Sequence, residues 1–153
     1  DREKPMNELL AQPAIQAWAA ASVVVALKTL LAGVYTSRIR LRKKVFSSAE
    51  DYAVQQIDGS PTEDEEVERS RRIHQNDLEA GLPFALVGFV YALTVPSTLA
   101  VWICFAGFPL ARIGHSICYA KGLMPHRTIF WAIGFFILIW MSIASLVAIP
   151  FGA

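Results

Sequence analysis

The chain has 153 residues, of which 54% are hydrophobic and 18% charged, and its formal net charge is +1. This length corresponds to one domain, and a nearly neutral charge gives no basis for expecting a nucleic-acid partner. The hydrophobic share exceeds that of an ordinary soluble domain, and the apolar residues come in four long blocks. Composition therefore excludes both a soluble domain and a single short secretory leader.

The four apolar blocks cover roughly residues 13–37, 76–95, 98–121 and 127–149. A membrane-spanning helix needs about 20 mostly apolar residues, so each block is long enough to be one span. We therefore predict an all-α integral membrane protein, with one domain over residues 1–153 and four helices in a bundle. Basic residues follow the first block, precede the second and separate the third from the fourth. The positive-inside tendency then places the connection at about 40–62 in the cytosol.

Two features precede the second span. Lys28 lies within the first apolar block, where an ammonium is costly unless it reaches water or a partner. We expect it either to snorkel or to meet a carboxylate of a neighbouring helix. Thr62 followed by Glu65 has the spacing of a capping box, so the second helix is predicted to begin near Pro61 and to protrude from the bilayer.

The second helix carries one polar face. Arg69, Arg72, Asn76 and Glu79 are spaced by three, four and three residues, which places them on the same side of a helix. This face runs without a helix breaker into the apolar second span, where Pro83 predicts a kink. We interpret it as half of a binding site at the lipid boundary.

The third and fourth spans supply further polar groups. Arg112, His115 and Tyr119 share one face of the third helix and should point into the bundle. Arg127 stands at the start of the fourth helix, where the helix dipole adds to its positive charge. Cys104 and Cys118 lie four turns apart in one predicted helix, so they cannot pair, and no metal site is predicted.

These polar residues are expected at one depth on the cytosolic side, and positive charge exceeds negative charge among them. Glu79 is predicted to pair with Arg112 or Arg72. The surplus predicts an anionic, peptide-like ligand, because arginine holds carboxylates, glutamate holds an ammonium, and asparagine and tyrosine bind amides. A thiol in that ligand would be favoured as thiolate beside Arg127. The set is Arg40, Arg72, Asn76, Glu79, Arg112, His115, Tyr119 and Arg127.

Several segments carry a closer resemblance. They are RLRKKVF–x3–ED (40–51), VERSRRIHQNDLEAGLPF (67–84), GFVYAL (88–93), ARIGHSICYA (111–120) and PHR (125–127). Together they resemble the MAPEG family, the membrane-associated proteins of eicosanoid and glutathione metabolism, in its glutathione transferase and prostaglandin E synthase branches. The resemblance runs over all four spans.

The resemblance implies a homotrimer of four-helix protomers that binds glutathione between adjacent subunits near the cytosolic face. It implies that Arg127 stabilises the thiolate, that Asp51 is an acid/base partner, and that Thr128 stands where a catalytic serine is proposed. It implies membrane lipid and a lipophilic electrophile or hydroperoxide as further partners. The implied glutathione contacts are Arg40, Arg72, Asn76, Glu79, His115, Tyr119 and Arg127.

Three functions follow as expectations from this resemblance. The first is a membrane glutathione transferase, with glutathione-dependent peroxidase activity at the same site. The second is an isomerase of the prostaglandin E synthase type, against which Gln75, Leu82, Thr128 and Trp131 are departures. The third is a non-catalytic lipid-binding protein. The expected membrane is the endoplasmic reticulum in a eukaryote or the inner membrane in a bacterium.

Overall fold

The computed structural model describes residues 3–149, and all the regular secondary structure within that range is helical. The ends of the predicted domain, residues 1–2 and 150–153, lie outside the described residues. The all-α class is confirmed. The helices are α1 (Glu3–Leu10), α2 (Pro13–Lys43), α3 (Ala49–Val54), α4 (Glu65–Leu93), α5 (Thr98–Phe105), α6 (Gly107–Ala120) and α7 (His126–Ala148).

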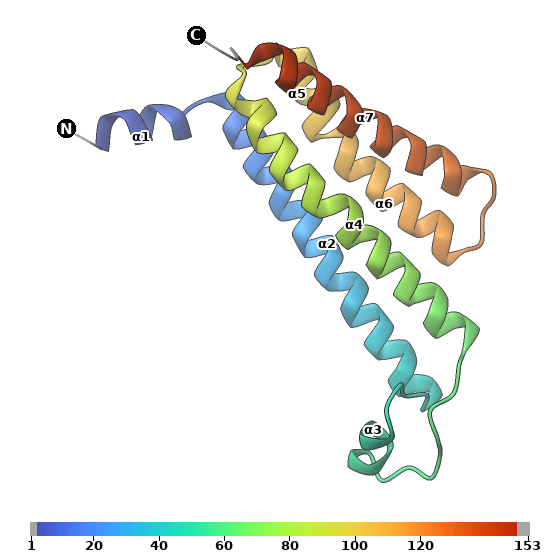
Figure 1. Ribbon diagram of the computed structural model, residues 1–153. Helices are drawn as coiled ribbons and strands as arrows, with labels where there is room; N and C mark the ends of the chain where they lie inside the picture. The colour runs from blue at the N-terminus through green and yellow to red at the C-terminus, as the bar shows by residue number, and fades with distance from the viewer. Residues whose placement is uncertain (1–2, 150–153) are drawn as a thin grey trace.

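The long helices lie alongside one another, with α1 projecting at one end of the bundle and α3 lying beyond the other end (Figure 1). Within residues 3–149, three helical segments are long and apolar enough to cross a membrane: Pro13–Lys43, Thr98–Ala120 and His126–Ala148. They match three of the four predicted spans. α4 is not among them, because charged and polar residues fill its first half, up to Glu79. A span over 76–95 therefore stays a prediction, and α4 itself ends at Leu93.

The start of α4 differs from the capping-box prediction. The helix begins at Glu65, and the carboxylate of Asp64 accepts the backbone N–H groups of Glu66 at 3.0 Å and Val67 at 3.1 Å. A side chain must stand directly before the first turn to satisfy these free N–H groups. Thr62 lies too early in the chain to do so. The predicted start near Pro61 was therefore wrong by one helical turn.

The two prolines act differently. α4 continues through Pro83 to Leu93. The third predicted span instead divides at Ala106 into α5 and α6, just before Pro109. Proline has no N–H to donate to the carbonyl four residues earlier, which interrupts the helical hydrogen bonds at that point.

The apolar core lies in the half of the bundle away from α3. Phe84, Phe108, Met141 and Cys104 are fully buried there, and the rings of Phe84 and Phe108 stack with their centroids 4.1 Å apart. Cys118 is also buried, and neither cysteine forms a disulfide. Large apolar side chains cover much of the outer surface as well, as a lipid environment requires. They include Leu27, Leu30, Leu31, Leu110, Phe136 and Val147.

Candidate functional site

Two cavities lie along the part of the polar face of α4 that carries Arg72, Asn76 and Glu79. We call the first, of about 470 Å³, the outer cavity; it is lined by Glu63, Asp64, Glu65, Glu68, Arg69, Arg72, Tyr119, Gly122 and Arg127. The second, of about 150 Å³, is the inner cavity; it is lined by Asn76, Glu79, Ala80, Phe108, Arg112, Trp131, Gly134, Phe135 and Leu138. The sequence predicted that these residues form one cluster. Within a single chain they instead line two cavities that follow one another along α4.

The outer cavity is built where α6 ends and α7 begins. The guanidinium carbon of Arg127 lies 4.5 Å from the ring centroid of Tyr119, which is a cation–π contact. The His115 ring packs edge-on against Tyr119, and its Nδ1 lies 3.1 Å from the Arg127 carbonyl oxygen. Because α7 begins at His126, Arg127 lies in the first turn, where the helix dipole adds to the positive potential.

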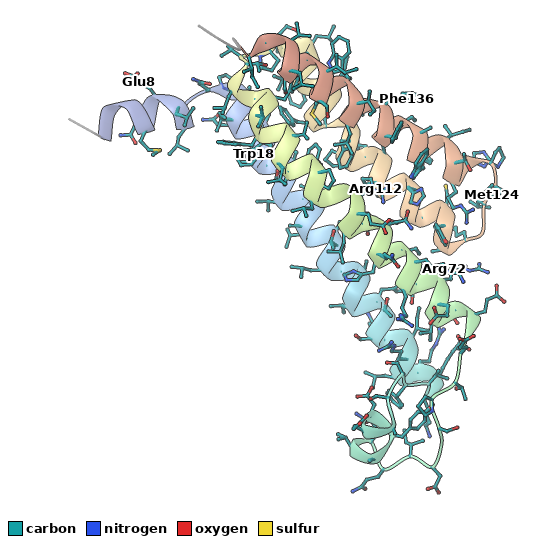
Figure 2. All side chains as sticks on the ribbon, in the orientation of Figure 1. Glu8, Trp18, Arg72, Arg112, Met124 and Phe136 are labelled. Atoms are coloured by element: carbon teal, nitrogen blue, oxygen red, sulfur yellow. The ribbon has the colours of Figure 1, made fainter. Side chains whose placement is uncertain are left out.

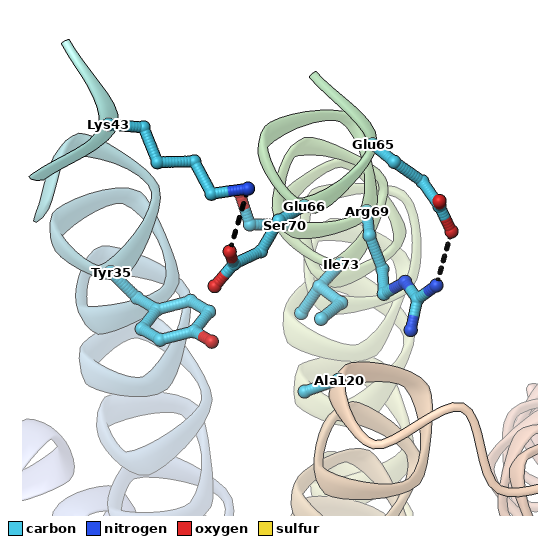
Figure 3. Close-up of a pocket in the computed structure, with 8 residues that line it drawn as sticks. All are labelled: Tyr35, Lys43, Glu65, Glu66, Arg69, Ser70, Ile73 and Ala120. Carbon is cyan, nitrogen blue, oxygen red and sulfur yellow. Dashed lines mark hydrogen bonds and ion pairs between the residues drawn. The ribbon is translucent and has the colours of Figure 1, made fainter. Parts of the chain in front are cut away.

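The lining of the outer cavity carries four carboxylates and three guanidinium groups, and only some of these charges are paired with one another. Arg69 donates to Glu65 at 2.6 Å, and Lys43 from α2 bridges to Asp64 at 2.9 Å and Glu66 at 3.0 Å. Figure 3 shows the Lys43–Glu66 and Glu65–Arg69 pairs in a neighbouring cavity, which lies beside the start of α4 and shares Glu65 and Arg69 with the outer cavity. Arg72 and Arg127 form no ion pair with any residue in 3–149. Their charges are available to an anionic ligand.

The salt bridges between the end of α2 and the start of α4 lower the pKa of two carboxyl groups. The pKa of Asp64 lies below its ordinary value because Asp64 forms hydrogen bonds, first with Lys43 and then with the Val67 N–H. Hydrogen bonds with Lys43 and then Arg42 lower the pKa of Glu66 in the same way. Both carboxylates therefore stay ionised and hold the end of α2 against the start of α4.

In the inner cavity, the predicted pairing of Glu79 with Arg112 or Arg72 is wrong. Glu79 accepts a hydrogen bond from Gln75 Nε2 at 3.0 Å, within its own helix. Arg112 instead donates to the Asp77 carboxylate at 3.3 Å and to the Asn76 backbone oxygen at 2.9 Å. The reason is the helical rotation between positions 77 and 79: the buried Asp77 faces α6, whereas the Glu79 side chain is exposed.

Asp77 is the residue that sequence reasoning missed. Its side chain is 1% exposed and also accepts from Lys28 Nζ at 2.5 Å, which confirms the alternative in which Lys28 meets a carboxylate of a neighbouring helix. Lys28 donates to the Ser116 hydroxyl at 2.6 Å as well. Lys28 was the feature of the sequence that could have indicated Asp77. A buried ammonium needs an anion, and Asp77 lies on the apolar side of α4.

The other predicted residues lie apart from both cavities. Arg40 lines a third cavity with Phe46, Pro61 and Arg71, and its Nε is buried without a hydrogen-bond partner among residues 3–149. Asp51 is exposed on α3, beyond the end of the bundle (Figure 1). Thr128 is exposed beside Arg127, and its hydroxyl faces Met124 Sδ at 3.8 Å. Within a single chain, Arg40 and Asp51 therefore do not line a cavity with Arg127.

Comparisons with a family model and with individual proteins support the same family. The sequence model of the MAPEG family matches residues 18–147. Human prostaglandin E synthase is 34% identical over 125 residues, covering 79% of this chain and 80% of that protein. Bovine microsomal glutathione S-transferase 1 is 32% identical over 142 residues, covering 90% of this chain and 92% of that protein. The polar spacing on α4 and α6, the apolar spans and these matches agree: the chain is an integral membrane protein that belongs to the MAPEG family.

Proposed function

We propose that this protein is a membrane glutathione transferase, which activates the glutathione thiol for attack on lipophilic electrophiles. The observation that carries the proposal is the outer cavity, where Arg72 and Arg127 stand without ion-pair partners in the described chain beside Tyr119 and His115. Relatives named glutathione S-transferase and prostaglandin E synthase support a glutathione-dependent reaction.

The charges suggest how the peptide lies along α4. The arginines of the outer cavity suit its carboxylates, and Glu79 in the inner cavity suits its ammonium. Asn76 and Tyr119 offer amide and hydroxyl groups to the peptide bonds. Glutathione in this orientation would extend from the outer cavity to the inner cavity, which are separate within a single chain.

The chemistry follows from the position of Arg127. A free thiol has a pKa of about 8.5, and a nearby guanidinium at a helix N-terminus favours the thiolate, which is the reactive nucleophile. With a chlorinated nitrobenzene, the sulfur bonds to the ring carbon, chloride leaves with the bonding electrons, and the thiol proton passes to solvent. A hydroperoxide would instead oxidise two glutathione molecules to the disulfide, yielding an alcohol and water.

The proposal includes the assembly and the membrane. We infer a homotrimer in which a neighbouring copy brings Arg40 and Asp51 towards the site, because one chain leaves both residues outside its two cavities. The basic ends of α2 and α7 then face the cytosol. The membrane is the endoplasmic reticulum in a eukaryote or the inner membrane in a bacterium.

The test is Arg127→Ala, with His126→Ala as the matched control on the neighbouring exposed position. Loss of the charge that stabilises the thiolate should lower conjugation of a chlorinated nitrobenzene by about 100-fold, as for loss of one preorganised electrostatic contact. The thermal shift produced by glutathione checks binding in the same detergent sample. Unchanged turnover in Arg127→Ala would remove the mechanism.

A second candidate, isomerisation of a prostaglandin endoperoxide, is favoured by the similarity to relatives named prostaglandin E synthase. It is tested by assaying the endoperoxide with the wild-type protein and with Asp51→Asn; a product that does not depend on Asp51 would argue against it. The non-catalytic alternative predicts that glutathione fails to raise the melting temperature.

A further inference from the structure

Three charged side chains from three helices meet inside the bundle, and we call them the ion cluster: Lys28 on α2, Asp77 on α4 and Arg112 on α6. Their side chains are 14%, 1% and 4% exposed. Burying charge costs free energy that well-packed apolar side chains of similar volume would not cost. Holding three helices together is therefore a weak explanation for the ion cluster.

Arg112 connects the ion cluster to the inner cavity. Its Nη2 donates both to Asp77 Oδ1 at 3.3 Å and to the backbone oxygen of Asn76 at 2.9 Å. It also lines the inner cavity together with Asn76 and Glu79. Figure 2 shows Arg112 at mid-height of the bundle, with Arg72 further along α4 towards α3. One guanidinium is thus both the end of the ion cluster and a wall of the cavity.

The way Asp77 is shared explains where Arg112 points. Lys28 occupies Oδ2 of Asp77, and Arg112 contacts only Oδ1. An arginine that has both carboxylate oxygens available prefers the two-point contact. Because Lys28 holds one oxygen, the guanidinium is left with a single contact to Asp77 and extends to Asn76.

We propose that Lys28 and Asp77 are positioning residues for the peptide ligand. By sharing one carboxylate they hold Arg112 against the backbone of Asn76, and so fix the turn of α4 that presents Asn76 and Glu79 to the inner cavity. This inference rests on the proposed binding of glutathione and adds two residues that do not touch the ligand.

The test is Lys28→Met in the detergent-solubilised full chain. One carboxylate then faces one guanidinium, so the variant keeps a balanced buried pair, and Arg112 turns towards Asp77. Since a displacement of about 1 Å can cost up to 100-fold, KM for glutathione should rise roughly 10-fold or more. The kcat at saturating glutathione and KM for the chlorinated nitrobenzene should stay within about twofold of the wild type, the range of unrelated sites.

Thr29→Val is the matched control. Thr29 is the next residue on α2 and is buried, but its hydroxyl bonds only to the Val25 carbonyl of its own helix at 2.9 Å. It should leave KM for glutathione unchanged. If Lys28→Met does not fold, Ser116→Ala keeps every charge and removes the second acceptor of Lys28, and should raise KM in the same direction by a smaller factor.

A double-mutant cycle separates positioning from general stability. If Lys28 acts through Asn76, then Lys28→Met should change KM by less than about twofold in an Asn76→Ala background, because the effects of coupled residues do not add. The positioning role would be overturned if Lys28→Met lowered kcat or thermal stability and left KM for glutathione unchanged. If Lys28→Met fails to fold, an unchanged KM in Ser116→Ala would overturn it. A wild-type protein that does not bind glutathione would instead overturn the proposed function.

Discussion

Replacing Asp77 by asparagine removes the carboxylate that forms ion pairs with both Lys28 and Arg112. The substitution preserves the shape of the side chain but leaves two cations in a site where the carboxylate is 1% exposed and the guanidinium 4% exposed. Removing one partner of a buried ion pair costs about 3–5 kcal/mol, because the remaining charge stays desolvated without compensation. We therefore expect Asp77→Asn to lower the free energy of unfolding by about 4 kcal/mol.

The exposed salt bridges of the same protein supply the comparison. In the Arg42–Glu66 pair the side chains are 64% and 38% exposed, and pairs of this kind contribute about 0–1 kcal/mol. Glu66→Gln is therefore the control for loss of a carboxylate by an isosteric change. Lys28→Met is the intermediate case, since it leaves Asp77 and Arg112 as a balanced pair.

The assay is thermal unfolding in detergent, followed by circular dichroism. For a chain of this size each kcal/mol corresponds to a shift of about 2–4 °C, so Asp77→Asn should lower Tm by about 10 °C. Glu66→Gln should shift Tm by less than about 4 °C on the same scale. Equal shifts for the buried and the exposed substitution would refute the reasoning, because burial would then not decide the cost of losing the anion.

Two further predictions concern the start of α4 and the contact between α6 and α7. Because the folded pKa values of Asp64 and Glu66 lie below their ordinary values of 3.8 and 4.5, their stabilisation is complete above those values. It is lost as the pH falls through the lowered pKa values, and amide exchange at the start of α4 should then speed up. In Gly114→Ala the new Cβ would lie 2.6 Å from the Phe130 ring, so this ring or the two helices must shift, at a cost of about 1–3 kcal/mol. A melting temperature equal to that of the wild type would contradict the packing seen at Gly114.

The sequence alone determined the helical class, three of the spans and the place of Arg127 at the start of a helix. These features depend on the length and period of apolar runs, which are local properties of a chain. The resemblance of the segments around Asn76 and His115 also led to the family, which the comparisons confirm. Asp64 as the cap of α4 was missed because several acidic residues precede that helix and only the backbone decides which one stands at its first turn.

Only the tertiary structure decided which charges meet. Glu79 was the expected partner of Arg112, yet Asp77, two residues earlier and on another side of α4, receives both Arg112 and Lys28. The sequence places Arg72, Asn76 and Glu79 on one face, but α6 and α7 divide that face between two cavities. Helical spacing fixes which residues of one helix share a side. The rotation and height of each neighbouring helix, set by how the apolar faces pack, fix which side chain from another helix stands opposite.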